Sequence, residues 1–423
     1  MSVATAPREL FKIKIRKNAD SIYCKATEIK SLFGNRRETI HHLLYYPEVM
    51  DVAVLADIVN RVSWYLPRSS FSQPMVSILV SNALLDIDPK SLKPPLSQHN
   101  YIGNSDNISL ISRKDVDFSK ADAIMLWDKW SLPDPRLLWH FNRVNIVDPT
   151  YYSEIESATY RNLYYQTIED PINDQFRKLS RENYWALLDK ASGYSKGYVF
   201  CTGPSLDQAF KFDYADGFNV VCNSIVKNKR LLKHINPHLL VFADQVFHFS
   251  PCRYSAEFRK MMLEAVKEYQ CHIIIPVNSV PLYLAHYPEL EDKIIGMPGQ
   301  EGDYNFPTVG KFYIKDGAWN IMTLYMVPVA SAVANKIFII GADGRKPDED
   351  YFWRHSFETQ FNELMQTAFD THPSFFRDRV YTDYYEHHCK FLEGMIHYGE
   401  SLSKKYYCLT PSYIPVLKER HKK

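Results

Sequence analysis

The chain has 423 residues, of which 46% are hydrophobic and 23% are charged, a composition typical of a soluble globular protein. The 50 Lys and Arg residues nearly balance the 49 Asp and Glu residues, and a net charge of +1 provides no overall field that would favour nucleic acid. The seven cysteines include no CxxC pair, which excludes the usual zinc-knuckle and redox motifs. No apolar stretch has the pattern of a signal peptide or the length of a membrane span. We therefore expect a cytoplasmic protein with reduced thiols, in at most peripheral contact with the inner face of the membrane.

A chain of this length favours two domains. In the first, helical spacing over residues 38–66 predicts one or two helices around Pro47. Short apolar runs then predict strands at 76–80, 108–111, 123–127 and 144–147, with a helix over 135–141. Strands that alternate with helices indicate a parallel sheet covered on both faces. We interpret residues 1–180 as a small α/β domain, and residues 150–190 as a mostly helical segment that bridges the two domains.

Residues 185–423 are predicted to form a second α/β domain with the same alternation. Its strands are expected at 198–201, 219–222, 239–243, 272–276, 336–340 and 406–409. Its helices are expected at about 206–212, 225–234, 254–269, 318–335 and 382–404. The fold class is therefore α/β, with two Rossmann-like parallel-sheet domains.

The turn after the first of these strands is the most informative motif. Gly203 allows backbone N–H groups to approach a phosphate, and Pro204 cannot continue the strand. Ser205 can cap the following helix, whose positive end would face that phosphate. The same turn also occurs between strands and helices of α/β proteins that bind no nucleotide.

Four predicted strands of this domain, including the one before Gly203, are followed by small or polar residues. These residues are Thr202-Gly203, Asn223, Asp244 and Gly341-Ala342-Asp343. Because the carboxyl ends of parallel strands meet at one edge of a sheet, their loops form one cleft. The sequence thus predicts a nucleotide site at this edge, where Asn223 contacts a base or ribose.

The order of these segments resembles two related families. The strand followed by GPSL, the CNS turn, the segment PHLLVFAD, the GAD strand end and a YCLTP strand follow one another over residues 197–415. This order is similar to that of the bacterial CMP-sialic-acid-dependent sialyltransferases. It is also similar to that of the motility-associated-factor proteins, a branch also described as pterin-pyrophosphokinase-like. The resemblance covers about half of the chain and implies a sialyltransferase-like variant of the GT-A fold for the second domain.

The resemblance implies a metal-independent, inverting glycosyltransferase. It would transfer a nonulosonic acid such as sialic acid from a CMP-activated donor to a surface glycan or a protein. The implied donor-binding residues are Thr202, Gly203, Pro204, Ser205, Asn223, Asp244, Asn320, Gly341 and Asp343, although Thr202 replaces an Asn of the sialyltransferases. Tyr351 would bind the leaving phosphate, and Arg345 and Arg354 would neutralise the phosphate or the carboxylate of the donor.

An inverting transfer also needs a base that reaches the acceptor hydroxyl, and histidine is the usual choice. His372 matches the position of that base best and His355 is second, whereas His387 and His388 lie inside a predicted helix and fit less well. No Asp-X-Asp pair ends a strand, so we expect no metal and no cofactor, with the CMP-sugar as co-substrate.

Two other functions fit parts of the same pattern. A pterin pyrophosphokinase-like enzyme would use ATP and Mg²⁺ and would need several converging carboxylates, beyond Asp244 and Asp343. A non-catalytic nucleotide- or glycan-binding module would retain Gly203 and Asn223 and would not depend on His372 or Tyr351. For the first domain we expect a role in recognising the acceptor.

Overall fold

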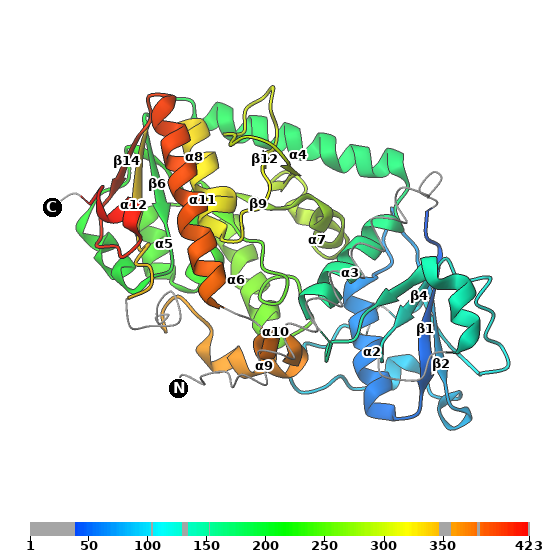
Figure 1. The fold of residues 1–423 in the computed structure, drawn as a ribbon. Helices are drawn as coiled ribbons and strands as arrows, with labels where there is room; N and C mark the ends of the chain where they lie inside the picture. Colours follow the sequence, from blue (N-terminus) through cyan, green and yellow to red (C-terminus); the bar gives the residue numbers. More distant parts are fainter. Residues whose placement is uncertain are drawn as a thin grey trace. The chain divides into compact units, whose positions relative to one another are not determined.

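The computed structural model describes residues 39–102, 105–128, 134–151, 153–346, 357–378 and 381–421. The chain divides into two compact units. Unit 1 contains the chain up to Leu96, Asn100–Glu169 and Thr371–Arg379, and unit 2 contains Ser97–His99, Asp170–Asp370 and Val380–Lys423. Each unit is built on its own parallel sheet (Figure 1). The predicted α/β class with two parallel-sheet domains is therefore confirmed.

Unit 1 is built on a five-stranded sheet of order β3-β2-β1-β4-β5, in which every pair of neighbours is parallel. Its strands are β1 (His42–Val49), β2 (Met75–Val80), β3 (Ile108–Ile111), β4 (Ala123–Leu126) and β5 (Val144–Ile146). Its α-helices are α2 (Val52–Tyr65), α3 (Ser153–Gln166) and α10 (Pro373–Asp378), with 3₁₀ turns η1 (Asn82–Leu84), η2 (Pro89–Ser91) and η4 (Pro135–Arg143). Helix α2 packs on β1, and α3 packs on β5.

The prediction of helices around Pro47 was wrong for the segment that forms β1. The sequence HLLYYPEV is apolar at consecutive positions because the central strand of a sheet that is covered on both faces buries both sides. Such a short run cannot be distinguished from a buried helix by periodicity alone. Pro47 lacks an N–H, and the pairing of β1 with β2 is irregular between Tyr45 and Val49. The predicted helix is correct only for Val52–Tyr65, which begins where Asp51 Oδ1 accepts the N–H groups of Ala53 and Val54.

Unit 2 is built on a seven-stranded parallel sheet of order β10-β9-β8-β7-β6-β13-β14. Its strands are β6 (Lys196–Phe200), β7 (Gly217–Cys222), β8 (Leu239–Val241), β9 (His272–Pro276), β10 (Ile294–Met297), β13 (Lys336–Ile340) and β14 (Lys405–Cys408). A separate two-stranded parallel sheet joins β11 (Gly299–Gln300) and β12 (Ile314–Lys315). The six strands predicted for this domain are all present, and β10 was missed because its sequence IIGM is short and contains a glycine.

The α-helices of unit 2 cover this sheet. They are α4 (Asp170–Ala191), α5 (Lys229–Ile235), α6 (Arg253–Tyr269), α7 (Val280–His286), α8 (Val327–Val333), α9 (Met365–Thr371), α11 (Tyr381–Ser401) and α12 (Pro415–Lys418). The short 3₁₀ segments are η5 (Pro204–Lys211), η6 (Asn223–Lys227), η7 (Val277–Ser279), η8 (Pro288–Leu290) and η10 (Asn362–Leu364). Helix α4 packs on β10, α8 packs on β6 and β13, and α11 packs on β14 (Figure 1).

Four predicted helices differ in type from what the sequence suggested. The helix predicted over 135–141 is the 3₁₀ segment η4, and the one predicted over 225–234 begins as the 3₁₀ segment η6 and continues as α5. The segment after Gly203 is the 3₁₀ helix η5 and not an α-helix. The helix predicted over 318–335 begins as a turn of π-helix, η9 (Met322–Met326), and continues as α8. Single π-turns occur often at functional sites. Within the described residues, no helix combines the length and the apolar character needed to cross a bilayer.

Candidate functional site

The carboxyl ends of four adjacent strands of unit 2 carry most of the predicted donor-binding residues. Strands β8, β7, β6 and β13 are neighbours in that order and are all parallel, so their carboxyl ends lie along one edge. Gly203 follows β6, Asn223 follows β7, Asp244 follows β8, and Asp343 follows β13. The structure therefore brings these four residues to one edge of the sheet, where open α/β sheets bind their ligands.

Gly203 lies against the loop that follows β13. Its N–H donates to Gly341 O at 2.8 Å, and Ser205 donates to the Asp343 carboxylate from its N–H at 3.1 Å and from its hydroxyl at 2.7 Å. A side chain at position 203 would collide with the Asp343 carboxylate and would approach Gly341 O to 2.5 Å. The residue is therefore a glycine because the protein's own backbone and carboxylate approach it closely, a reason that the sequence did not reveal.

The Asp343 carboxylate occupies the start of η5, where a donor phosphate was predicted to lie. Burial raises the pKa of Asp343 above its usual value, while the hydrogen bonds from Ser205 oppose this shift. Gly341, which precedes it, has a φ of 71°, a conformation that favours glycine. Thr202, on the other side of Gly203, is buried.

Three buried oxygens near the ends of β7 and β8 have no hydrogen-bond partner among the described residues. They are Asn223 Oδ1, Gln245 Oε1 and Thr359 Oγ1. Asn223 adopts a left-handed backbone conformation with φ 49°, and the hydroxyl of the next residue, Ser224, donates to Thr359 O. A buried polar atom without a partner costs about 1–3 kcal/mol, so a group of them suits a ligand that supplies the missing donors. Sequence reasoning found Asn223 but missed Gln245 and Thr359, although Gln245 directly follows the strand-end residue Asp244.

Asp244 organises the loop after β8. Its Oδ1 accepts the N–H groups of Val246 and Phe247 at 2.9 and 3.0 Å, and its own N–H donates to His248 Nδ1 at 3.1 Å. His248 is 3% exposed, and burial lowers the pKa of its ring to about 4. The loop is thus held by a neutral histidine that accepts a hydrogen bond through Nδ1.

The buried His248 makes the stability of unit 2 depend on pH. Its folded pKa of about 4 lies below the usual value of 6.5, so the unfolded chain binds more protons between these two values. The contribution of the neutral ring is complete above pH 6.5 and is lost as the pH falls toward 4, by on the order of 3 kcal/mol. Urea denaturation of the wild type and of His248→Asn at pH 7 and pH 5 measures how much of the loss of unfolding free energy is due to His248. Equal losses of unfolding free energy in the two proteins would contradict it.

Asn320 and Arg345 are the remaining described candidates for donor binding. Asn320 Oδ1 accepts the N–H of Met322, the first residue of the turn of π-helix, at 2.9 Å. The preceding Trp319 is 55% exposed and is stacked on His387, with ring centroids 4.0 Å apart. The Arg345 guanidinium lies over the ring of Tyr385 at 4.7 Å. Both candidates are therefore held by neighbours of unit 2.

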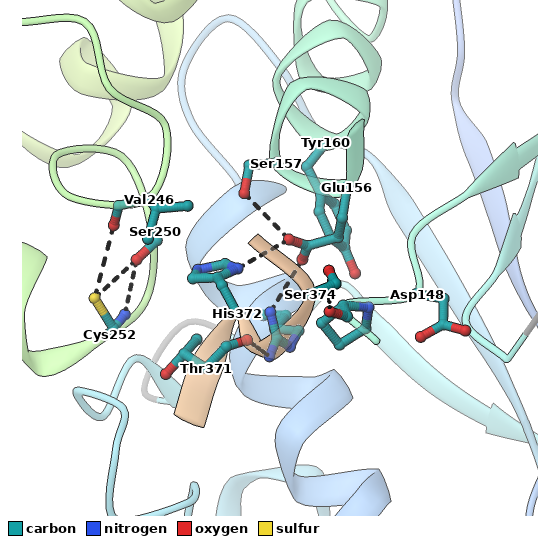
Figure 2. A network of polar contacts seen from close by, with 12 residues as sticks. Asp148, Glu156, Ser157, Tyr160, Val246, Ser250, Cys252, Thr371, His372 and Ser374 are labelled. Carbon is teal, nitrogen blue, oxygen red and sulfur yellow. Dashed lines mark hydrogen bonds and ion pairs between the residues drawn. The ribbon is translucent and has the colours of Figure 1, made fainter. Parts of the chain in front are cut away.

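His372 belongs to unit 1 and is completely buried. Its Nδ1 lies 3.2 Å from Glu156 Oε2 (Figure 2). Arg61 Nη1 donates to Glu156 Oε1 at 3.0 Å. Arg61 also binds Asp57 at 2.8 Å and donates to Thr371 O at 2.8 Å. A base must reach its substrate, and the burial of His372 in this network does not provide such access. Its role as the base stays a prediction.

Arg61 and Glu156 were not recognised from the sequence. Arg61 shares α2 with Asp57, and Glu156 shares α3 with Glu154 and Arg161. Nothing in the sequence singles out Arg61 and Glu156 as a pair that meets across 95 positions. Three further candidates, Tyr351, His355 and Arg354, lie outside the described residues. In the described part of the chain, no three His, Cys, Asp or Glu side chains converge as the ligands of a metal ion would.

Comparisons with known proteins give one distant likeness. No protein-family model and no curated protein matches the chain. The structure of a mutant of the alpha-2,3/8-sialyltransferase CstII covers 53% of this chain and 88% of its own, with 16% identity and a TM-score of 0.29. The sialyltransferase CstII from Campylobacter jejuni also matches over 53% of this chain. Its complex with the substrate analogue CMP-3FNeuAc has 15% identity, a TM-score of 0.30 and 88% of its own chain covered. Its complex with cytidine-5'-monophosphate has 16% identity, a TM-score of 0.28 and 86% covered.

Proposed function

We propose that the chain is a glycosyltransferase that transfers a nonulosonic acid such as sialic acid from a CMP-activated donor to a glycan or protein acceptor, without a metal. The observation that carries this proposal is that Asn223 Oδ1 after β7, Gln245 Oε1 after β8, and Thr359 Oγ1, whose backbone oxygen accepts from Ser224, are buried and have no hydrogen-bond partner among the described residues. The amide oxygens of Asn223 and Gln245 can only accept hydrogen bonds. The cytosine amino group and the ribose hydroxyls supply donors for them. The order of motifs over residues 197–415 supports the same donor.

The donor phosphate would lie at the turn between β6 and η5. In the described conformation the Asp343 carboxylate accepts from Ser205 there, so an ionised Asp343 would repel a phosphate. A phosphate at this turn would therefore displace the Asp343 carboxylate from Ser205, whose N–H and hydroxyl would then donate to the phosphate. Arg345, held over Tyr385 at 4.7 Å, would neutralise the leaving nucleotide or the carboxylate of the sugar.

In this proposal, unit 1 recognises the acceptor. A base is also needed at the acceptor hydroxyl, and His372 could serve only in a conformation in which it leaves its contact with Glu156. Transfer by a protein that carries only unit 2, at the rate of the full chain, would exclude a role for unit 1.

Replacing Asn223 with glycine tests the donor site. Glycine keeps the left-handed backbone and removes only the amide side chain. Asn223→Gly is expected to weaken CMP binding by about tenfold or more, because one orphaned acceptor no longer receives its hydrogen bond. Asn236→Gly is the matched control, since Asn236 is exposed and has the same φ of 49° at the end of α5. Isothermal titration calorimetry of the two variants with CMP measures the difference.

The same titrations separate the alternatives. CMP is compared with CDP, UDP, GDP and ATP, each with and without Mg²⁺. A preference for CMP without metal, lost in Asn223→Gly and retained in Asn236→Gly, supports the glycosyltransferase. Preferential binding of ATP with Mg²⁺ would replace it with the pyrophosphokinase-like function. If the protein binds CMP but transfers sugar from no CMP-sugar, the non-catalytic binding module would be the function that fits.

A further inference from the structure

Unit 1 has a pocket of about 220 Å³ near the point where the order of strands along its sheet reverses. From β1 the chain adds β2 and β3 on one side and later β4 and β5 on the other, so the loops after β1 and β4 diverge and leave a crevice. Tyr46 and Glu48 line the pocket from the end of β1, Leu79 from β2, Arg113 after β3, and Arg136 after β4. The ends of four strands therefore contribute to one pocket at the position expected for a ligand site.

Several residues that line this pocket contact the buried ring of Phe118 or one another. Phe118, which is 4% exposed, makes an edge-to-face contact with Tyr46 at 5.5 Å and carries the Arg136 guanidinium on its ring at 5.2 Å. Arg136 donates to both oxygens of Asp134, from Nη2 to Oδ2 at 2.7 Å and from Nε to Oδ1 at 3.1 Å. Val116 packs against the core cluster that contains Phe118. The Phe118 ring is thus part of the core, and the Arg136 guanidinium, whose side chain is 60% exposed, is held by Asp134 and by that ring.

The pocket is not built for a nucleotide. The sequence has no glycine at positions 35–102 or 104–192, so the turns that follow β1 and β2 lack a glycine that would let the backbone cradle a phosphate. The N-terminus of α2 is already satisfied, because Asp51 Oδ1 accepts the N–H groups of Ala53 and Val54 at 2.7 and 3.1 Å. Recognition must therefore come from side chains, and the volume suits a ligand about the size of one sugar ring.

The charges of the pocket define the chemistry of that ligand. Arg113 is exposed and is within ion-pair distance of no described carboxylate, although its charge helps to lower the pKa of Asp134, which lines the same pocket, so its guanidinium can bind an anion. Glu48 lines the same pocket and, as an ionised carboxylate, accepts hydrogen bonds and repels a bare anion. A ligand that satisfies both groups carries an anionic group together with hydroxyl groups, and the Tyr46 ring offers a surface for stacking.

We propose that this pocket binds a hydroxylated acid of the size of a monosaccharide, either a sugar carboxylate or a sugar phosphate. Arg113 and Arg136 bind its anionic group, and Glu48 accepts hydrogen bonds from its hydroxyls. The site lies wholly within unit 1 and does not depend on the donor proposed for unit 2.

Methyl NMR of the full chain tests this site without relying on activity. The Leu79 and Val116 methyl groups line the pocket and report binding, and the exposed Val309 of unit 2 serves as the remote control. The probes are glucuronic acid, glucose 6-phosphate, glucose and inorganic phosphate. Saturable shifts at Leu79 and Val116 with glucuronic acid or glucose 6-phosphate are expected, at dissociation constants of about millimolar.

Two variants and a control complete the experiment. Arg113→Ala and Glu48→Gln are each expected to weaken binding by about tenfold, whereas Arg177→Ala on the exposed face of α4 leaves it unchanged. Glucose and inorganic phosphate should each bind at least about tenfold more weakly than the two acids. The proposal is overturned if neither acid shifts the pocket methyls, if inorganic phosphate binds as tightly as glucose 6-phosphate, or if Arg113→Ala binds like the wild type. A preference for one of the two acids would identify the anionic group.

Discussion

Gly203→Ala is expected to destabilise unit 2 by about 3 kcal/mol or more. A methyl group at this position would approach Gly341 O to 2.5 Å and would collide with the Asp343 carboxylate. Overpacking commonly costs about 1–3 kcal/mol, and the carbonyl of Gly341 cannot rotate away as a side chain can. The hydrogen bonds that join the loop after β6 to the loop after β13 would be lost together, because they run between the same residues. Gly203 is thus required for the connection of these loops.

Hydrogen exchange and urea denaturation measure this effect. Cys201 N–H donates to Ile340 O at 2.8 Å, so its exchange rate reports separation of the β6 and β13 ends. Gly193→Ala is the control, because nothing lies within 4 Å of its added methyl group, and a change of at most about 1 kcal/mol is expected. Asp343→Ala combined with Gly203→Ala should not restore stability, since the contact with Gly341 O remains. Similar stability of Gly203→Ala and Gly193→Ala would refute the proposed role.

Breaking the buried ion pair of unit 1 is expected to have a comparably large effect. Arg61 and Glu156 have side chains that are 4% and 1% exposed, and removing one partner of such a pair costs about 3–5 kcal/mol. Arg61→Met should cost more than Glu156→Leu. The first leaves Glu156 and Asp57 without their cation, whereas the second leaves Arg61 with Asp57 at 2.8 Å. Burial alone would lower the pKa of Arg61, but the two carboxylates raise it above its usual value, so the guanidinium stays charged.

A double-mutant cycle separates the pair from its surroundings. The double variant, Arg61→Met with Glu156→Leu, should be more stable than the sum of the single losses predicts, because the fully buried Glu156 carboxylate is no longer left without Arg61, and Asp57, which stays, has a side chain that is 26% exposed. The exposed pair Arg177–Asp174 is the control and should contribute at most about 1 kcal/mol. Exchange of the amides at 371–378 is the local readout, since Arg61 donates to Thr371 O. Strictly additive losses would mean that the two residues do not act as a pair.

Much of the fold was predictable because local chemistry and final environment agree. The strands of unit 2 are short apolar runs that end at polar or glycine residues, which is the pattern of a strand buried on both faces. Their order in the chain was enough to place Gly203, Asn223, Asp244 and Asp343 at strand ends. Parallel pairing then places all four at the same edge. Strand β1 was predicted wrongly as a helix, because the apolar run around Pro47 fits a buried helix and a buried strand equally well.

The sequence by itself determined the α/β class, the alternation of strands and helices, and the strand-end residues of the candidate donor site, because hydrophobic period and turn residues are local properties. Only the tertiary structure decided which charges meet. It placed His372 beside Glu156 and Arg61 in unit 1, set Asp343 on the turn at Gly203, and left Asn223 Oδ1 without a hydrogen-bond partner among the residues described. It also gathered the ends of four strands around Arg113 and Glu48. Such contacts join residues that are far apart in the chain, and burial and pairing are fixed by the packing of whole elements and by no local pattern.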